Sequence, residues 1–121
     1  MGLDLRLLIV DGKANDWGFS YSMLECNRDY SLFNAIGEQV SEEIPLTFKL
    51  QSYVARRDDG KSWYGLLEST DAYGHRRRWL RADALAKAFA DSAQDLSSFN
   101  RAIGAFVKNL SPDRFIVLDW H

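Results

Sequence analysis

Apolar and polar residues alternate over the first ten positions of the chain. The odd-numbered positions from Leu3 to Ile9 are aliphatic, whereas Asp4 and Arg6 stand between them. A period of two is typical of a strand with one face on a core, so this segment predicts a first strand at or next to the edge of a sheet. After a turn-rich stretch, the same alternation over residues 19–24 predicts a second strand.

Two more segments with a period of two lie in the middle of the chain. Residues 46–56 read LTFKLQSYVAR, and the turn signal at 58–60 separates them from a returning strand over 61–69. A further turn is predicted at Asp71–Gly74. A third strand from Arg76 to Leu80 would then complete an antiparallel meander.

The first helical pattern covers residues 31–43. Its apolar side chains recur at helical intervals as far as Val40, and Ser31 is placed to act as the N-cap. The helix must end before Pro45, because the residue before a proline is driven out of the helical conformation. The sequence predicts a short helix here.

Two later helices and a final strand complete the pattern. Residues 81–93 are rich in alanine with apolar positions on one side, and residues 97–110 have apolar side chains at intervals of four, three, one and three. Ser97 or Ser98 can cap the second of these helices. The run RFIVLDW at 114–120 is β-branched and aromatic, which predicts a last strand.

Strands followed by helices and a closing strand predict an α+β fold. We expect a single domain over residues 1–121, with a mainly antiparallel sheet and two to three helices packed on one face. A chain of 121 residues can bury a sufficient core without a metal or a disulfide.

Composition indicates the cellular compartment in which the protein works. Cys26 is the only cysteine, which excludes an internal disulfide and favours a reducing compartment, so we expect a cytoplasmic protein. Asp4 and Arg6 interrupt the apolar start of the chain, which argues against a signal peptide. The longest uncharged apolar run, Leu7 to Val10, is far shorter than the roughly 20 residues of a membrane helix. We therefore expect no membrane association.

Motifs for catalysis, metal binding and nucleotide binding are absent from the sequence. His75, His121 and Cys26 have no zinc-site spacing, and the glycines form neither GxGxxG nor GxxxxGK. Cys26 lacks a helix terminus or glycine elbow that would lower its pKa. The sequence therefore favours a buried or unreactive thiol over a catalytic nucleophile. Aspartates near predicted strand ends leave a magnesium site open. We expect no enzyme and no cofactor.

Charge is distributed unevenly along the chain. The formal net charge is −2, yet residues 56–81 hold seven basic residues against four acidic ones. Arginine beside aromatic side chains is a composition that binds phosphates and stacks bases. The basic candidates for partner binding are Arg56, Arg57, Arg76 and Arg78.

The run Arg76 to Trp79 cannot serve one surface if it is a strand. Alternate side chains point to opposite faces, so Arg76 and Arg78 share one face while Arg77 and Trp79 share the other. We expect Trp79 to lean on the core or on a helix. Arg77 must then extend its charge to the surface or find a carboxylate.

Acidic residues form a second set of candidates. Glu38, Glu42 and Glu43 follow the apolar part of the first predicted helix, and Asp91 and Asp95 lie between the later helices. Acidic patches on small domains imitate nucleic acid or cap a basic protein surface. We take Glu38, Glu42 and Glu43 as acidic candidates for partner binding, with Asp91 and Asp95 as further phosphate mimics.

Three segments carry a resemblance to known proteins: Met1-Gly2-Leu3-Asp4 before an alternating strand, the turn at 71–74 leading to Trp79 and an alanine-rich helix, and the ending at 115–121. Together they resemble small uncharacterised proteins encoded by bacteriophages and prophages, over most of the chain. The resemblance implies a setting, the cytoplasm of an infected bacterium, and no activity.

In that setting our leading hypothesis is a non-enzymatic protein-interaction module. It would bind and inhibit a host or defence-system protein such as a CRISPR effector or a nuclease. One alternative is a nucleic-acid-binding protein that uses the Arg/Trp patch. Another is an immunity protein that neutralises a toxin.

Overall fold

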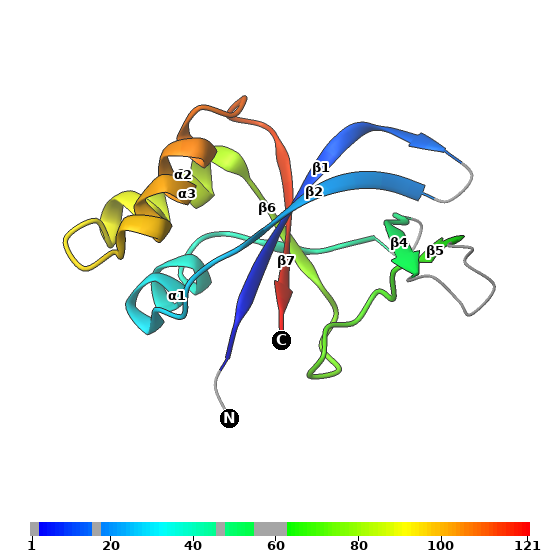
Figure 1. The fold of residues 1–121 in the computed structure, drawn as a ribbon, viewed down its shortest axis with the longest axis horizontal. Coiled ribbons are helices and arrows are strands. Elements are labelled where there is room, and N and C mark those ends of the chain that lie inside the picture. The colour runs from blue at the N-terminus through cyan, green and yellow to red at the C-terminus, as the bar shows by residue number, and fades with distance from the viewer. Residues whose placement is uncertain (1–2, 16–17, 46–47, 55–62) are drawn as a thin grey trace.

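The computed structural model describes residues 3–15, 18–45, 48–54 and 63–121 (Figure 1). In chain order the elements are β1 (Leu5–Asn15), β2 (Gly18–Glu25), α1 (Tyr30–Gly37), β3 (Glu42–Glu43), β4 (Gln51–Val54), β5 (Trp63–Leu66), β6 (Arg78–Arg81), α2 (Ala82–Asp91), α3 (Ser98–Lys108) and β7 (Phe115–Trp120). A five-stranded antiparallel sheet has the order β2-β1-β7-β6-β3, and β4 pairs with β5 separately. The three helices lie on one side of the sheet, and the fold is α+β, as predicted.

Strand β1 lies between β2 and β7, one position from the edge of the sheet. Leu5, Leu7 and Ile9 face the helices and belong to the first hydrophobic core. Leu8 and Val10 point to the other side of the sheet, which we call the helix-free face, and belong to a second core. Burial on both faces explains why this strand is apolar at both alternating positions from Leu7 onward.

Helix α1 begins and ends earlier than the sequence predicts. Asp29 is the N-cap, and its carboxylate accepts the backbone N–H of Leu32, so the predicted cap Ser31 lies inside the helix. An aspartate is favoured here because its oxygen satisfies a free N–H and its charge suits the helix N-terminus. The helix ends at Gly37, and Val40 is 87% exposed beyond it.

Helices α2 and α3 pack against each other over the first core. Ser97 is the N-cap of α3, as one of the two predicted caps, and its hydroxyl oxygen accepts the N–H of Asn100. The inward side chains of the two helices include Leu85, Phe89, Ile103 and Val107. Phe99 and Phe106, predicted on the same apolar side, lie at its margin and are about half exposed.

Asn100 connects α3 to the segment after β2. Its side chain is fully buried; Oδ1 accepts the N–H of Asn27 at 2.8 Å, and Nδ2 donates to the carbonyl of Asn27 at 3.0 Å. Both halves of the buried amide are satisfied, so a polar residue is stable in this position.

The predicted meander is confirmed in its first hairpin, where β4 pairs with β5, and is wrong for its third strand. Strand β6 pairs with β7 and β3 and not with β5, and the described part of the 46–56 segment is strand only at β4. The register of β6 on β7 places Leu80 opposite Ile116, and both side chains are buried in the first core. Burial of these aliphatic side chains favours the long-range pairing over the local one.

Aromatic rings cover part of the helix-free face. Phe19 stacks on Phe48 with centroids 4.8 Å apart, Phe48 on Phe115 at 4.7 Å, and Phe115 on Trp79 at 4.1 Å. These rings pack against the second core, where no helix is available to exclude water. Trp79 leans on the core, as predicted.

Candidate functional site

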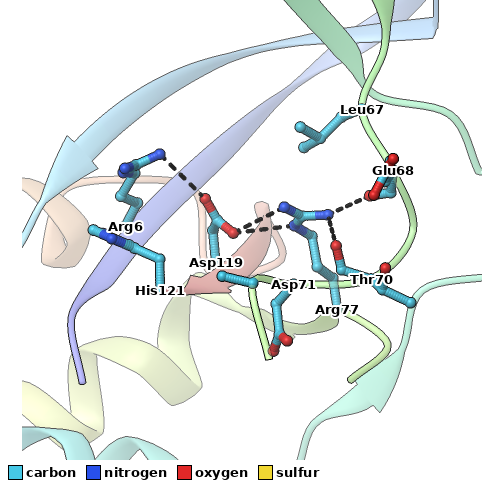
Figure 2. A pocket seen from close by; sticks show the side chains of 9 residues that line it. Arg6, Leu67, Glu68, Thr70, Asp71, Arg77, Asp119 and His121 are labelled. Atoms are coloured by element: carbon cyan, nitrogen blue, oxygen red, sulfur yellow. Dashed lines mark hydrogen bonds and ion pairs between the residues drawn. The ribbon is translucent and has the colours of Figure 1, made fainter. Parts of the chain in front are cut away.

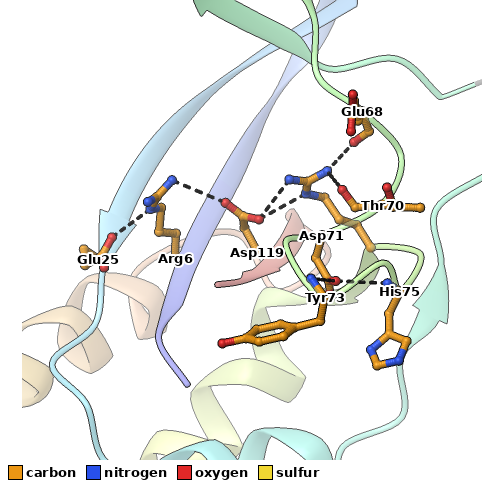
Figure 3. A network of polar contacts seen from close by, with 9 residues as sticks. Arg6, Glu25, Glu68, Thr70, Asp71, Tyr73, His75 and Asp119 are labelled. Carbon is orange, nitrogen blue, oxygen red and sulfur yellow. Dashed lines mark hydrogen bonds and ion pairs between the residues drawn. The ribbon is translucent and has the colours of Figure 1, made fainter. Parts of the chain in front are cut away.

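A row of alternating charges crosses three strands and reaches the residue before a fourth, at one end of the helix-free face (Figure 3). Glu25 on β2, Arg6 on β1 and Asp119 on β7 are register partners, and Arg77 precedes β6. Arg6 Nε donates to Glu25 Oε2 at 2.9 Å, and Arg6 Nη1 lies 3.7 Å from Asp119 Oδ2. Residues opposite each other on antiparallel strands are close neighbours, so the register places opposite charges side by side.

Arg77 and Asp119 are the buried members of this row. Arg77 is 7% exposed and Asp119 is 6% exposed. Arg77 donates from Nε and Nη2 to Asp119 Oδ1 at 3.1 and 3.0 Å, and from Nη1 to the carbonyls of Glu68 and Thr70. Of the two outcomes predicted for Arg77, extension of its charge to the surface or pairing with a carboxylate, the structure shows the second.

A hollow of about 530 Å³ opens beside this pair, and we call it the polar hollow (Figure 2). Asp119 points between Arg6 and Arg77. The lining residues are Arg6, Leu67, Glu68, Thr70, Asp71, Ala72, Arg77, Asp119 and His121.

The turn over Asp71–His75 forms one wall of the polar hollow. Asp71 Oδ1 accepts the backbone N–H groups of Tyr73 at 2.9 Å and His75 at 3.0 Å. Gly74 has a φ of +79°, a conformation that costs glycine little and other residues more. The predicted turn is thus present, and its conformation is held by the side chain of its own first residue.

A second hollow of about 500 Å³ lies on the other side of the same turn, and Asp71 contributes to both. We call it the mixed hollow because its lining holds both signs of charge. It is lined by Glu43, Asp71, Gly74, His75, Arg76, Arg78 and Trp120. Three of the residues predicted to bind a partner, Glu43, Arg76 and Arg78, therefore meet at one place.

The arginines of the mixed hollow are held by the chain itself. Arg76 Nη2 donates to the carbonyl of Ile44 at 2.6 Å, and its Nη1 lies 3.7 Å from Glu43 Oε2. Arg78 donates to the hydroxyl and the carbonyl of Ser41 at 2.8 and 2.6 Å. The pairing of β3 with β6 places Glu43 opposite Arg78, so one predicted acidic residue lies beside two predicted basic ones.

The other predicted residues are dispersed. Glu38 is the C-cap of α1, Glu42 lies on β3 opposite Trp79, Asp91 ends α2, and Asp95 lies in the connection to α3. Arg56 and Arg57 fall outside the described residues. The acidic candidates thus do not all meet at the mixed hollow.

From the sequence, Arg6 and Glu68 are not expected in a site, and Asp119 is expected only among the strand-end aspartates that leave a magnesium site open. A signal for two of them is present in the sequence, because Arg6 interrupts the apolar run over 5–10 and Asp119 the run over 115–120. A charged residue within a strand that is buried on both faces needs a partner of opposite charge. Arg6 is such a partner for Glu25 and Asp119, and Asp119 is such a partner for Arg6 and Arg77. Glu68 has no comparable signal.

Burial changes the acid–base chemistry of two groups near the sheet. The pKa of Tyr21 is raised, first because the phenol is partly buried and second because the carboxylate of Asp119 is near. Burial raises the pKa of the Cys26 thiol to about 12. Within the described residues, no group of three or more His, Cys, Asp or Glu side chains is placed to hold a metal ion.

Comparison of the chain with protein-family models, with curated proteins and with solved structures gave no match. The described part of the chain contains no helix with the length and apolar character needed to cross a membrane.

Proposed function

We propose that this chain is a protein-interaction module that binds its partner through the Asp71–His75 turn and the two hollows beside it. The observation that supports the proposal most is the meeting of Glu43 with Arg76 and Arg78 in the mixed hollow. Opposite charges on one concave surface complement a protein surface that carries both signs, and such complementarity selects partners and speeds association.

The same arrangement argues against nucleic acid as the main ligand. Binding of a phosphate backbone requires cations that face solvent and aromatic faces that bases can stack on. Arg77 is buried against Asp119, and Trp79 is stacked on Phe115. Arg77 and Trp79, half of the Arg/Trp run, are therefore not available to contact a nucleic acid.

The resemblance to phage-encoded proteins supports a class of partner. We expect a host or defence-system protein, such as a CRISPR effector or a nuclease, whose surface the chain covers and thereby inhibits. The mode of action is stoichiometric occupancy, which needs a rigid surface and no reacting group. Arg77 supports such rigidity, because it ties the carbonyls of Glu68 and Thr70, just before the turn, to β7.

The test is affinity capture from a bacterial lysate with three immobilised proteins: the unmodified chain, Arg78→Glu and Arg101→Glu. Arg78 lines the mixed hollow, whereas Arg101 is an exposed arginine on α3 and serves as a matched control. We expect one protein to be retained by the unmodified chain and by Arg101→Glu, and to be about tenfold depleted with Arg78→Glu. Thermal unfolding of both variants verifies that they are folded.

Two results would count against this function. One is the absence of any protein whose retention depends on Arg78. The other is retention that disappears after nuclease treatment of the lysate, because the ligand would then be a nucleic acid. Capture that also requires Arg101 would place the binding surface elsewhere.

A further inference from the structure

The polar hollow contains carboxylates that the chain's own cations leave uncompensated. Its lining holds Glu68, Asp71 and Asp119 together with Arg6 and Arg77. In the part of the chain that the structure describes, neither Glu68 nor Asp71 lies within ion-pair distance of a cation. The hollow therefore has room for added positive charge.

The two arginines of the hollow are already occupied. The guanidinium of Arg77 donates to Asp119 and to two backbone carbonyls. Arg6 is shared between Glu25 and Asp119. An anionic ligand would have to displace one of these contacts and would also meet the carboxylates of Glu68 and Asp71, which have no cation beside them among the described residues.

The floor of the hollow offers an acceptor. Asp119 is 6% exposed, and its Oδ1 receives both hydrogen bonds from Arg77. Its Oδ2 accepts no hydrogen bond from a described residue, and Arg6 Nη1 is 3.7 Å away. Asp119 Oδ2 is not among the described buried atoms that lack a partner, so this oxygen is open to solvent in the hollow. An incoming N–H group would replace solvent as its hydrogen-bond donor.

We infer that the polar hollow receives a basic side chain, lysine or arginine, from the partner protein. Such a side chain combines several N–H donors with an apolar stem. The donors match Asp119 Oδ2 and the carboxylates of Glu68 and Asp71, while Leu67 and Ala72 line the hollow where the stem would pass. The inference rests on the proposed function and adds that the partner's surface is basic at this point.

The first experiment titrates the isolated chain with short peptides and follows its amide NMR signals. The probes are acetyl-Gly-Lys-Gly-amide, acetyl-Gly-Arg-Gly-amide and, as the uncharged control, acetyl-Gly-Gln-Gly-amide. We expect saturable shifts at residues 70–72 and 119–121 with a cationic peptide, weakened by added salt, because part of the attraction is screened. The stronger of the two cationic peptides identifies the preferred head group. Equal shifts with the glutamine peptide, or none with either cation, would overturn the inference.

The second experiment removes the rim charges. Glu68→Gln with Asp71→Asn deletes two charges, and the asparagine retains the Oδ1 that accepts the turn's N–H groups. Asp91→Asn with Asp95→Asn deletes the same charge from exposed positions on α2 and the α2–α3 connection. We expect the first variant to bind the cationic peptide about tenfold more weakly and the second to bind it unchanged. Equal loss in both variants would show a general effect of net charge and would refute a defined site.

Applied to the captured partner, the same variants separate the two proposals. One outcome is capture that depends on Arg78 and yet is unaffected by Glu68→Gln with Asp71→Asn. This result would support the interaction function and refute the insertion of a basic partner side chain into the polar hollow. Peptide binding at residues 70–72 without any Arg78-dependent capture would support the cation site and contradict the proposed function.

Discussion

Arg77 and Asp119 form a buried ion pair in which two guanidinium nitrogens share one carboxylate oxygen, at 3.1 and 3.0 Å. The third nitrogen of the guanidinium donates to the carbonyls of Glu68 and Thr70. The Arg77 side chain therefore ties β7, the last strand in the chain, to the segment that leads into the Asp71–His75 turn. The stability of the fold and the shape of the proposed binding surface depend on the same contact.

Replacing Arg77 by methionine should destabilise the protein strongly. Methionine fills much of the same volume but leaves Asp119 as a nearly buried charge and two carbonyls without their donor. Breaking a buried pair from one side typically costs about 3–5 kcal/mol. Urea unfolding followed by tryptophan fluorescence measures the loss.

The double variant Arg77→Met with Asp119→Leu separates charge from packing. With both charges gone, no uncompensated carboxylate remains, so a large part of the lost free energy of unfolding should return. If the double variant is instead as unstable as the sum of the two single ones, the pair does not act as a coupled unit. Arg78→Met, in an exposed arginine of β6, is the matched control and should change stability by less than about 1 kcal/mol.

Gly104→Ala should destabilise the protein although it improves helix propensity. An added Cβ would lie 2.9 Å from Cδ1 and 3.1 Å from Cγ of Phe89, and that ring is 4% exposed in the core. Overpacking of about 1–3 kcal/mol outweighs a propensity gain of about 1 kcal/mol. Gly37→Ala, where nothing lies within 4 Å, should be neutral or stabilising. Thermal unfolding measures the stability of both variants. A Gly104→Ala variant more stable than the unmodified protein would contradict the close packing of α3 on Phe89.

Cys26 should be unreactive in the folded protein. The thiol is buried, and burial raises its pKa to about 12, so at pH 8 almost none of it is the reactive thiolate. Reaction with a disulfide reagent such as DTNB should be about 1000-fold or more slower than in the urea-unfolded chain. Fast labelling under native conditions would mean that the cysteine is accessible after all.

The carboxyl of Asp4 should titrate at unusually low pH. Arg28 donates to both of its oxygens, at 3.1 and 2.8 Å, and this holds the pKa of Asp4 below its ordinary value of 3.8. Because the folded pKa is lower than the unfolded one, the stabilising contribution is complete above pH 3.8 and is lost as the pH falls through the folded value. A carboxyl ¹³C NMR titration measures the midpoint.

The variant Arg28→Gln tests the cause of that shift. Without the guanidinium, the Asp4 midpoint should return toward 3.8. Arg101→Gln, which removes an arginine from α3, should leave it unchanged. A midpoint that stays low in Arg28→Gln would assign the shift to another group.

The local sequence pattern predicted correctly those elements whose conformation depends on their own residues alone. The alternation from Leu3 to Ile9 predicted β1, and the polar turn at Asp71–Gly74 was placed correctly because its chemistry is contained in a few residues. The cap of α1 was misplaced at Ser31 because Asp29 and Ser31 are both good caps, and the sequence does not rank them.

The candidate site was predicted only in part, for a different reason. The split of the Arg76 to Trp79 run between two faces follows from the pleat of a strand and needs no partner to be known. The partners themselves are distant in the chain: Asp119 is 42 positions from Arg77, and Ser41 is 37 positions from Arg78. No periodicity within a segment reports which strand will lie beside it.

By itself, then, the sequence determined the α+β class, most of the helices and strands, and the choice left to Arg77 between reaching the surface and pairing with a carboxylate. Only the tertiary structure decided that β6 pairs with β7 and β3, that Asp119 is the carboxylate, and that Glu43 meets Arg76 and Arg78 beside one turn. The physical reason is that strand order is set by which apolar faces can be buried together over long range. Once that order is set, the charges that share a hollow follow from the register.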